Sequence, residues 1–350
     1  MSDRPVFVIG CPRSGTTMLQ LMLHSHPRIA VAPETRFLVP AYYRRRTWGD
    51  LRTEQRRKAL AEWIATDRST KFRELKIDKN EFVRQSVEGP GSLGSVIGTA
   101  FRMYADRFDK KRWGDKRPSY VKQVDMLLRL FPDAQFIHLI RDGRDCVASL
   151  KEMPWYTLDS FHAISTWAEA MDAGAKLRRT MSQDTYFELK YEDLTDDPAT
   201  ELKRLCHFLE EDFSPAMISP REAASVAVPL HKVWHQNTHG EVTRSRVGSW
   251  ANRLDDWEIA LCEHTLGDRL QAMGYELTGA PKPAKEHITA CQKTMQKRKA
   301  SRTRKHIRDR LNRLREPSPV AALLTSGQRS LAGVPQQRPD SDAEVAEQAV

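Results

Sequence analysis

Short apolar runs alternate with helix-like stretches through the first part of the chain. VFVIG (6–10), QFIHLI (135–140) and TYFELKYEDL (185–194) have the length and composition of strands. TTMLQLMLHS (16–25) follows the first run and CVASLKEM (146–153) follows the second, and both are helix-like. Apolar runs that alternate with helices predict βαβ units, and therefore an α/β domain in which helices flank a central parallel sheet.

The pattern changes near residue 279. Before that point, the stretches 51–68 and 79–108 are typical of amphipathic surface helices. GAPKPA (279–284) then interrupts the alternation, and a highly basic, helix-like stretch follows at about 287–315. From residue 316 on, Pro, Ser, Gln and Gly dominate, which predicts disorder. The sequence therefore predicts a domain over residues 1–278, a basic helical extension over 279–316 and a disordered tail over 317–350.

The charge of the chain is concentrated in this extension. The formal net charge is +10, and residues 281–316 alone carry 13 Lys/Arg against 3 Asp/Glu, which is also +10. The rest of the chain is therefore close to neutral, and the basicity says little about the domain. The extension is suited to a weak anionic partner, either RNA or a membrane surface, or it is a solvated helix without a partner.

Several classes of protein are disfavoured by composition. No run approaches the roughly 18 apolar residues of a membrane span, and the N-terminal MSDRPVFVIG lacks the features of a signal peptide. The five cysteines are scattered, without a CxxC pair or a Cys/His cluster: Cys11, Cys146, Cys206, Cys262 and Cys291. We therefore expect no disulfide framework, no zinc site and a reducing, cytoplasmic location.

The strongest local signal is GCPRSGTT (10–17), between a predicted strand and a predicted helix. The spacing from Gly10 to Gly15 matches the frame of a P-loop, so we expect a P-loop-like, three-layer fold. Gly15 would allow the backbone to approach a ligand closely. The N–H groups of residues 13–17 would then point at an anion at the N-terminus of the helix.

This loop differs from the P-loop of ATP-binding proteins at one important position. Thr16 stands where those proteins have a lysine, and Arg13 supplies the positive charge from within the loop. A guanidinium can bind two oxygens of a tetrahedral anion at once. The loop is therefore better suited to a 5'-phosphosulfate than to a triphosphate with Mg²⁺. A kinase or NTPase with a degenerate P-loop remains the alternative.

A second anion site is indicated by IHLIRDGRDCVAS (137–149). Arg141 follows a buried strand, where ligands bind in open α/β sheets, and Ser149 lies eight residues further, in the next helix. Together they could hold one phosphate group. In the other interpretation, Arg141 forms a surface ion pair with Asp142 or Asp145. Arg144 is expected to be a surface residue of this kind.

Four motifs in this order resemble the PAPS-dependent sulfotransferases, where PAPS is 3'-phosphoadenosine 5'-phosphosulfate. They are CPRSGTT, RDGRDCVAS, YEDL and a late RVGSW, and the resemblance covers about residues 4–275. The segment PRSGTTMLQLMLHSHPRIAVAPETR is most similar to the protein-tyrosine sulfotransferase branch and its bacterial relatives. The resemblance implies an enzyme that transfers a sulfuryl group from PAPS to an acceptor hydroxyl or amine.

The resemblance also implies roles for individual residues. Glu34 matches the catalytic base, and Lys116 matches a lysine that stabilises the transition state. The implied cofactor-binding residues are Arg13, Ser14, Gly15, Thr16 and Thr17 for the 5'-phosphosulfate, Arg141 and Ser149 for the 3'-phosphate, Tyr191 near the adenine, and Arg246 as a late basic position. Residues 234–243 match a stretch in which the family has a sulfate-holding serine; here Asn237 or Thr238 would replace it. Met153 stands where the tyrosine branch has an arginine.

Sulfuryl transfer needs no metal, since the main tasks are alignment of the reacting groups and stabilisation of charge. Arg13 and Lys116 would stabilise the leaving phosphate oxygen, while Glu34 takes the proton of the acceptor. More ordinary roles stay open at this point: Glu34 as a carboxylate at a helix N-terminus, Lys116 in an ion pair with Asp115, and Tyr191 as an edge-strand aromatic. The class of acceptor, whether peptide tyrosine, sugar, lipid head group or small phenol, is not indicated.

Overall fold

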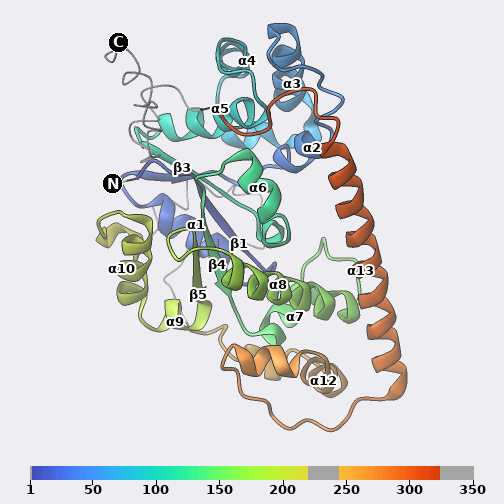
Figure 1. The fold of residues 1–350 in the computed structure, drawn as a ribbon. Coiled ribbons are helices and arrows are strands. Elements are labelled where there is room, and N and C mark those ends of the chain that lie inside the picture. The colour runs from blue at the N-terminus through green and yellow to red at the C-terminus, as the bar shows by residue number, and fades with distance from the viewer. Residues whose placement is uncertain (1, 220–243, 324–350) are drawn as a thin grey trace, which may run out of the picture.

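A five-stranded, entirely parallel sheet forms the centre of the molecule (Figure 1). The computed structural model describes residues 2–219 and 244–323. The order of the strands is β2-β3-β1-β4-β5, with β1 in the middle. They comprise β1 (Val6–Gly10), β2 (Ile29–Val31), β3 (Arg112–Lys116), β4 (Gln135–Ile140) and β5 (Tyr186–Lys190). The predicted α/β fold with a central parallel sheet is confirmed.

Helices cover both faces of this sheet, which gives three layers. The helices in the described part of the chain are α1 (Thr16–His24), α2 (Leu38–Tyr43), α3 (Glu54–Thr66), α4 (Lys79–Glu88), α5 (Leu93–Asp106), α6 (Val124–Leu130), α7 (Gly143–Lys151), α8 (Ser160–Thr180), α9 (Tyr191–Asp196), α10 (Pro198–Leu209), α12 (Asp256–Ala272) and α13 (Lys285–Arg313). Successive side chains of β1 point to opposite faces of the sheet, so each face packs against its own layer of helices. Val6 and Val8 pack in one cluster with α1 and α10, while Phe7 and Ile9 pack in the other with α5, α7 and α8.

The register of the strands determines where the loops meet. Val8 is paired with Lys116 of β3 on one side and with Ile137 of β4 on the other. Because all strands are parallel, the carboxyl ends of β1, β3 and β4 lie at the same edge of the sheet. This edge carries the loop after Gly10, the end of β3 and the start of α7.

Two predicted elements differ from the structure. The stretch 79–108 forms two helices, and α5 is not a surface helix because most of its residues, including Val96, Ile97 and Phe101, are buried. The strand expected over 185–194 ends at Lys190, and helix α9 begins at once with Tyr191. Tyr191 is therefore not an edge-strand residue.

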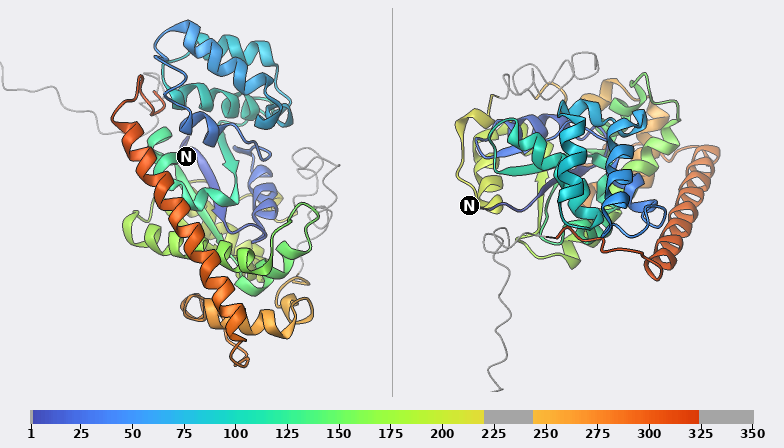
Figure 2. Two further views of the ribbon diagram at one scale, coloured as in Figure 1. Left: turned by 90° about the vertical axis from the view of Figure 1, so that its right-hand side faces the viewer. Right: turned by 90° about the horizontal axis from the view of Figure 1, so that it is seen from above.

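Helix α13 covers the stretch where the sequence predicted a basic helix. It runs along one side of the domain, from α12 to α2 (Figures 1 and 2), and packs against α8. Arg298 of α13 forms an ion pair of 2.7 Å with the buried Glu169 of α8. None of the described helices is both long enough and apolar enough to cross a membrane.

Residues 319–323 were expected to be part of the disordered tail, but they pack against the domain. The backbone N–H of Gly94 donates to the carbonyl of Val320 (2.9 Å), and the N–H of Ala322 donates to the carbonyl of Leu130 (2.7 Å). Gly94 makes this approach possible, because a Cβ atom there would lie 2.4 Å from the nitrogen of Ala322. No local pattern in the sequence indicates this contact. Residues 324–350 lie outside the described residues.

A buried ion pair in β3 leads to a prediction about stability. Arg112 and Glu211 are both fully buried, with 3.4 Å between Nη1 and the carboxylate, and burial lowers the pKa of Arg112 to about 10. Glu211→Ala would leave the guanidinium without this charge. We expect a loss of about 3–5 kcal/mol in the free energy of unfolding, measured by urea denaturation. The control Asp172→Ala breaks an exposed ion pair with Arg269 and should cost less than about 1 kcal/mol. Equal losses would contradict the prediction.

Candidate active site

The loop between β1 and α1 has the curled backbone of an anion site. Arg13 (φ 73°) and Gly15 (φ 95°) both adopt left-handed conformations, and Gly15 is the N-cap of α1. Such turns direct successive N–H groups toward one point in front of the helix. A Cβ atom at Gly15 would lie only 2.5 Å from the ring of Tyr191, so this position requires glycine. An arginine with positive φ is unusual, and strained residues of this kind cluster at functional sites.

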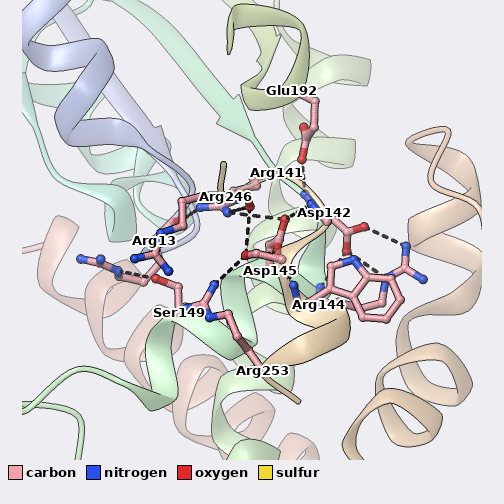
Figure 3. Close-up of polar contacts among 12 residues, drawn as sticks. Arg13, Arg141, Asp142, Arg144, Asp145, Ser149, Glu192, Arg246 and Arg253 are labelled. Carbon is pink, nitrogen blue, oxygen red and sulfur yellow. Dashed lines mark hydrogen bonds and ion pairs between the residues drawn. The ribbon is translucent and has the colours of Figure 1, made fainter. Parts of the chain in front are cut away.

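Arg13 joins this loop to the second predicted anion site (Figure 3). Its Nε donates to the hydroxyl of Ser149 on α7 (3.0 Å), and its carbonyl accepts a hydrogen bond from Nη1 of Arg141 (3.2 Å). Burial lowers the pKa of Arg13, and the charge of Arg141 lowers it further. The structure thus brings Arg13 together with Arg141 and Ser149, which lie more than 120 residues later in the sequence.

The side chains of Arg141 and Tyr191 stack beside the loop between β1 and α1. The guanidinium of Arg141 lies 4.4 Å from the centre of the Tyr191 ring, and Arg141 is 6% exposed. It pairs with Asp145 at 3.4 Å, so the ion pair exists, but it is buried and not on the surface. Its Nε and the hydroxyl of Ser14 are both buried and have no hydrogen-bond partner within the described part of the chain. These are donors that an anion could use.

Glu34 and Lys116 meet on the other side of the loop. Lys116, the last residue of β3, is 4% exposed, and its Nζ lies 3.6 Å from the carboxylate of Glu34. The same Nζ donates to the hydroxyl of Thr17 (3.3 Å), in the first turn of α1. Asp115 instead accepts a hydrogen bond from Tyr120 (2.8 Å), and burial raises its pKa to about 7. The alternative in which Lys116 pairs with Asp115 is therefore wrong.

Comparison with known proteins identifies the family. Residues 5–215, more than half of the chain, match the sequence model of the sulfotransferase family. The chain belongs to the sulfotransferase family. Protein-tyrosine sulfotransferase A of Caenorhabditis elegans is 22% identical over 79% of this chain and 68% of its own length. The protein-tyrosine sulfotransferase of Drosophila melanogaster is 23% identical over 77% of this chain and 51% of its own length. The sulfotransferase thus spans about half to two thirds of these relatives.

Solved structures show the same fold. The sulfotransferase domain of the Synechococcus PCC 7002 olefin synthase is similar with a TM-score of 0.56 and 22% identity, over 79% of this chain and 96% of that domain. The sulfotransferase domain of the curacin biosynthetic pathway is similar with a TM-score of 0.54 and 19% identity, over 78% and 98%. The predicted P-loop-like fold and the predicted enzyme class, a sulfotransferase, are both confirmed.

Asp145 of this sulfotransferase has a role that the sequence analysis missed. Its carboxylate accepts hydrogen bonds from the N–H groups of Gly248 (3.0 Å) and Trp250 (2.9 Å) and from the hydroxyl of Ser249 (3.1 Å). It therefore holds the RVGSW segment against α7. Nη2 of Arg141 also donates to the backbone carbonyl of Arg246. In the sequence, the only feature that could have indicated this role is that Asp145 is the second carboxylate of the motif RDGRD (141–145).

Arg144 was expected on the surface, and this prediction is wrong. The side chain is buried, with ion pairs of 2.8 Å to Asp142 and 2.7 Å to Glu263, and it lies 4.1 Å from the centre of the Trp250 ring. Helix α12, which carries Glu263, covers this side of α7 in the structure. A local reading of the sequence could not show this contact, because Glu263 is 119 residues away.

Arg253 is a further cation that the sequence analysis missed. It forms an ion pair with Glu152 (2.6 Å) and donates to the hydroxyl of Ser249 (2.8 Å). Its charge also contributes to lowering the pKa of Arg13, so the two guanidinium groups are close (Figure 3). Met153, next to Glu152, is where the tyrosine branch has an arginine. The predicted segment 234–243, with Asn237 and Thr238, lies outside the described residues.

Proposed function

We propose that this sulfotransferase uses PAPS as its co-substrate and transfers the sulfuryl group in line to an acceptor hydroxyl or amine. The observation that supports this most directly is the contact between Arg13 and Ser149. These residues belong to the two predicted anion sites, and PAPS carries acidic groups at both ends of one adenine nucleotide. Because the two sites adjoin, one ligand can reach both.

The residues present are suited to this ligand. The N–H of Ser14 donates to the carbonyl of Cys11 (3.2 Å). The N–H groups of Arg13, Gly15, Thr16 and Thr17, together with the hydroxyl of Ser14, which has no partner among the described residues, would hold the 5'-phosphosulfate. Arg141 and Ser149 would hold the 3'-phosphate, for which the buried Nε of Arg141 is an available donor. Tyr191 would line the nucleotide site beside Gly15, and Arg246 would approach it from the RVGSW segment. Thr16 and Thr17 would complete the loop with their N–H groups.

In the proposed mechanism, Glu34 is the general base and Lys116 the main electrophilic group. The carboxylate of Glu34 would accept the proton of the acceptor, and its side chain is 30% exposed, so an acceptor can reach it. Lys116 lies between Glu34 and Thr17, from where its charge stabilises the negative charge that develops on the leaving oxygen. Arg13 would contribute from the opposite side of the loop. No metal is needed for these roles.

Titration calorimetry with 3',5'-adenosine bisphosphate, the product nucleotide, tests the proposal against the kinase or NTPase alternative. We expect it to bind at least tenfold more tightly than ATP–Mg²⁺. Arg141→Ala should weaken its binding by about tenfold to a hundredfold, the value of a charge-assisted hydrogen bond. The control Arg269→Ala removes an arginine that pairs with Asp172, away from the site, and should change nothing. Tighter binding of ATP–Mg²⁺ would favour the alternative.

The proposal extends to the organisation of the chain. All proposed site residues lie within residues 1–278, which we propose as the catalytic unit, with 279–316 as an extension packed on it. A cytoplasmic location remains part of the proposal; the five cysteines, all buried and unpaired, are compatible with it. The named relatives act on protein tyrosine, so a tyrosine peptide is the first acceptor to test with labelled PAPS. Sugars, lipid head groups and phenols complete the panel.

A further inference from the structure

Three large apolar side chains are exposed on the outer face at the end of α13. Ile307, Leu311 and Leu314 are 54%, 60% and 81% exposed, and they are the three most exposed large hydrophobic residues in the described ranges. Their spacing of four and three residues places them in one row along the helix. Leu314, directly after Arg313, still has helical backbone angles, so the row continues to the end of the helix. We call these three residues the outer stripe.

The inner face of α13 packs against the domain and forms polar contacts with it. Asp309 is buried and pairs with Arg45 of the segment after α2 (2.8 Å), and it accepts a hydrogen bond from Tyr42 (3.3 Å). Ile307 and Leu311 are each two positions from Asp309, and therefore on the far side of the helix, since each residue turns it by about 100°. Within residues 2–219 and 244–323, the packing of α13 against the domain makes no use of the outer stripe.

Basic residues surround the outer stripe. Between Glu286 and Asp309 the helix has no acidic residue, and Asp309 faces inward. The exposed cations beside the stripe are Arg304, Arg308, Arg310 and Arg315. The outer face of this end of α13 thus combines an apolar row with a strong positive charge and without a compensating carboxylate.

We propose that the outer stripe and its basic border dock on an anionic lipid surface. A helix that lies in a membrane interface needs an apolar row for the acyl boundary and cations for the head groups, and α13 offers both on one face. Nucleic acid would use the cations but gain nothing from three aliphatic side chains. A second copy of the chain would place like charges opposite each other. This proposal is independent of the proposed function.

Vesicle sedimentation with the full chain tests the proposal. At low salt we expect binding to vesicles of phosphatidylglycerol and phosphatidylcholine, and at least tenfold weaker binding to phosphatidylcholine alone. The triple variant Ile307→Ser/Leu311→Ser/Leu314→Ser should weaken binding to the anionic vesicles by about tenfold or more, because apolar burial is lost. Arg304→Gln/Arg308→Gln should weaken it as well and reduce its dependence on salt.

A matched control uses exposed apolar residues elsewhere. Trp155 and Leu158 are 49% and 51% exposed, and Trp155→Ser/Leu158→Ser should leave vesicle binding unchanged. Thermal unfolding followed by circular dichroism should show that each variant is folded, since all the altered side chains are on the surface. The proposal is overturned if anionic vesicles are not bound, or if the triple variant binds them as well as the parent. It is equally overturned if sedimentation velocity shows that the outer stripe joins two copies of the chain.

Discussion

Glu34→Gln is expected to lower kcat by about 10²–10⁴, the usual contribution of a general base. The amide keeps the size of the carboxylate but cannot accept the proton of the acceptor. Binding of 3',5'-adenosine bisphosphate should change little, because Glu34 faces Lys116 and not the predicted phosphate sites. Single-turnover assays with labelled PAPS measure the chemical step, and calorimetry measures nucleotide binding.

A carboxylate of similar exposure on α4 gives the matched control for this experiment. Glu81 is 37% exposed, compared with 30% for Glu34, and likewise forms an ion pair, in this case with Arg84. Glu81→Gln should leave kcat unchanged. If Glu34→Gln keeps more than about a tenth of the parental kcat and remains folded, Glu34 is not the base.

Lys116→Met should lower kcat by about 10²–10³, as expected when one group that stabilises developing charge is removed. Lys116 contacts both Glu34 and Thr17, so its loss also removes one contact of the carboxylate. The double variant with Glu34→Gln should therefore lose less than the product of the two single effects. Steady-state and single-turnover rates of the three variants test this.

Lys122→Met controls for the loss of a lysine ion pair. Lys122 pairs with the buried Glu169 at 2.9 Å, away from the proposed site, and its loss should affect stability without a specific loss of kcat. A reduction of kcat below threefold in Lys116→Met would show that the lysine does not act in the chemical step. Additive losses in the double variant would contradict the expected coupling between Lys116 and Glu34.

The sequence predicted best what depends on local pattern. Buried strands such as β1 and β4 appear as uninterrupted apolar runs, and a loop with Gly10 and Gly15 at fixed spacing is a local feature. Arg141 lies two residues before α7, which carries Ser149 eight residues later, so their proximity could also be foreseen. The contact of these residues with Arg13 follows from the parallel pairing of β1 with β4. The family resemblance implied that one nucleotide reaches both sites, but the pairing of these strands was not predicted.

What the sequence could not show depends on distant partners. Arg144 is buried only because α12 brings Glu263 to it, and the role of Asp145 depends on a segment about one hundred residues later. The sequence of α5 has an amphipathic pattern, which predicts a surface helix. The pattern does not show that neighbouring elements bury most of this helix. Residues 319–323 pack because Gly94 leaves room for a second backbone. Each of these cases is a tertiary contact without a local sequence signal.

The ion pairs at the end of α13 constrain the order of events during synthesis. Arg45 is almost completely buried, and its partners Asp309 and Glu316 are 264 and 271 residues further along the chain. Arg129, on α6, also pairs with Glu316 (2.6 Å). The region around α2 therefore becomes complete only after residue 316 has left the ribosome, so the ion pairs of Arg45 and Arg129 with Glu316 cannot stabilise the earlier part of the domain while it is being synthesised.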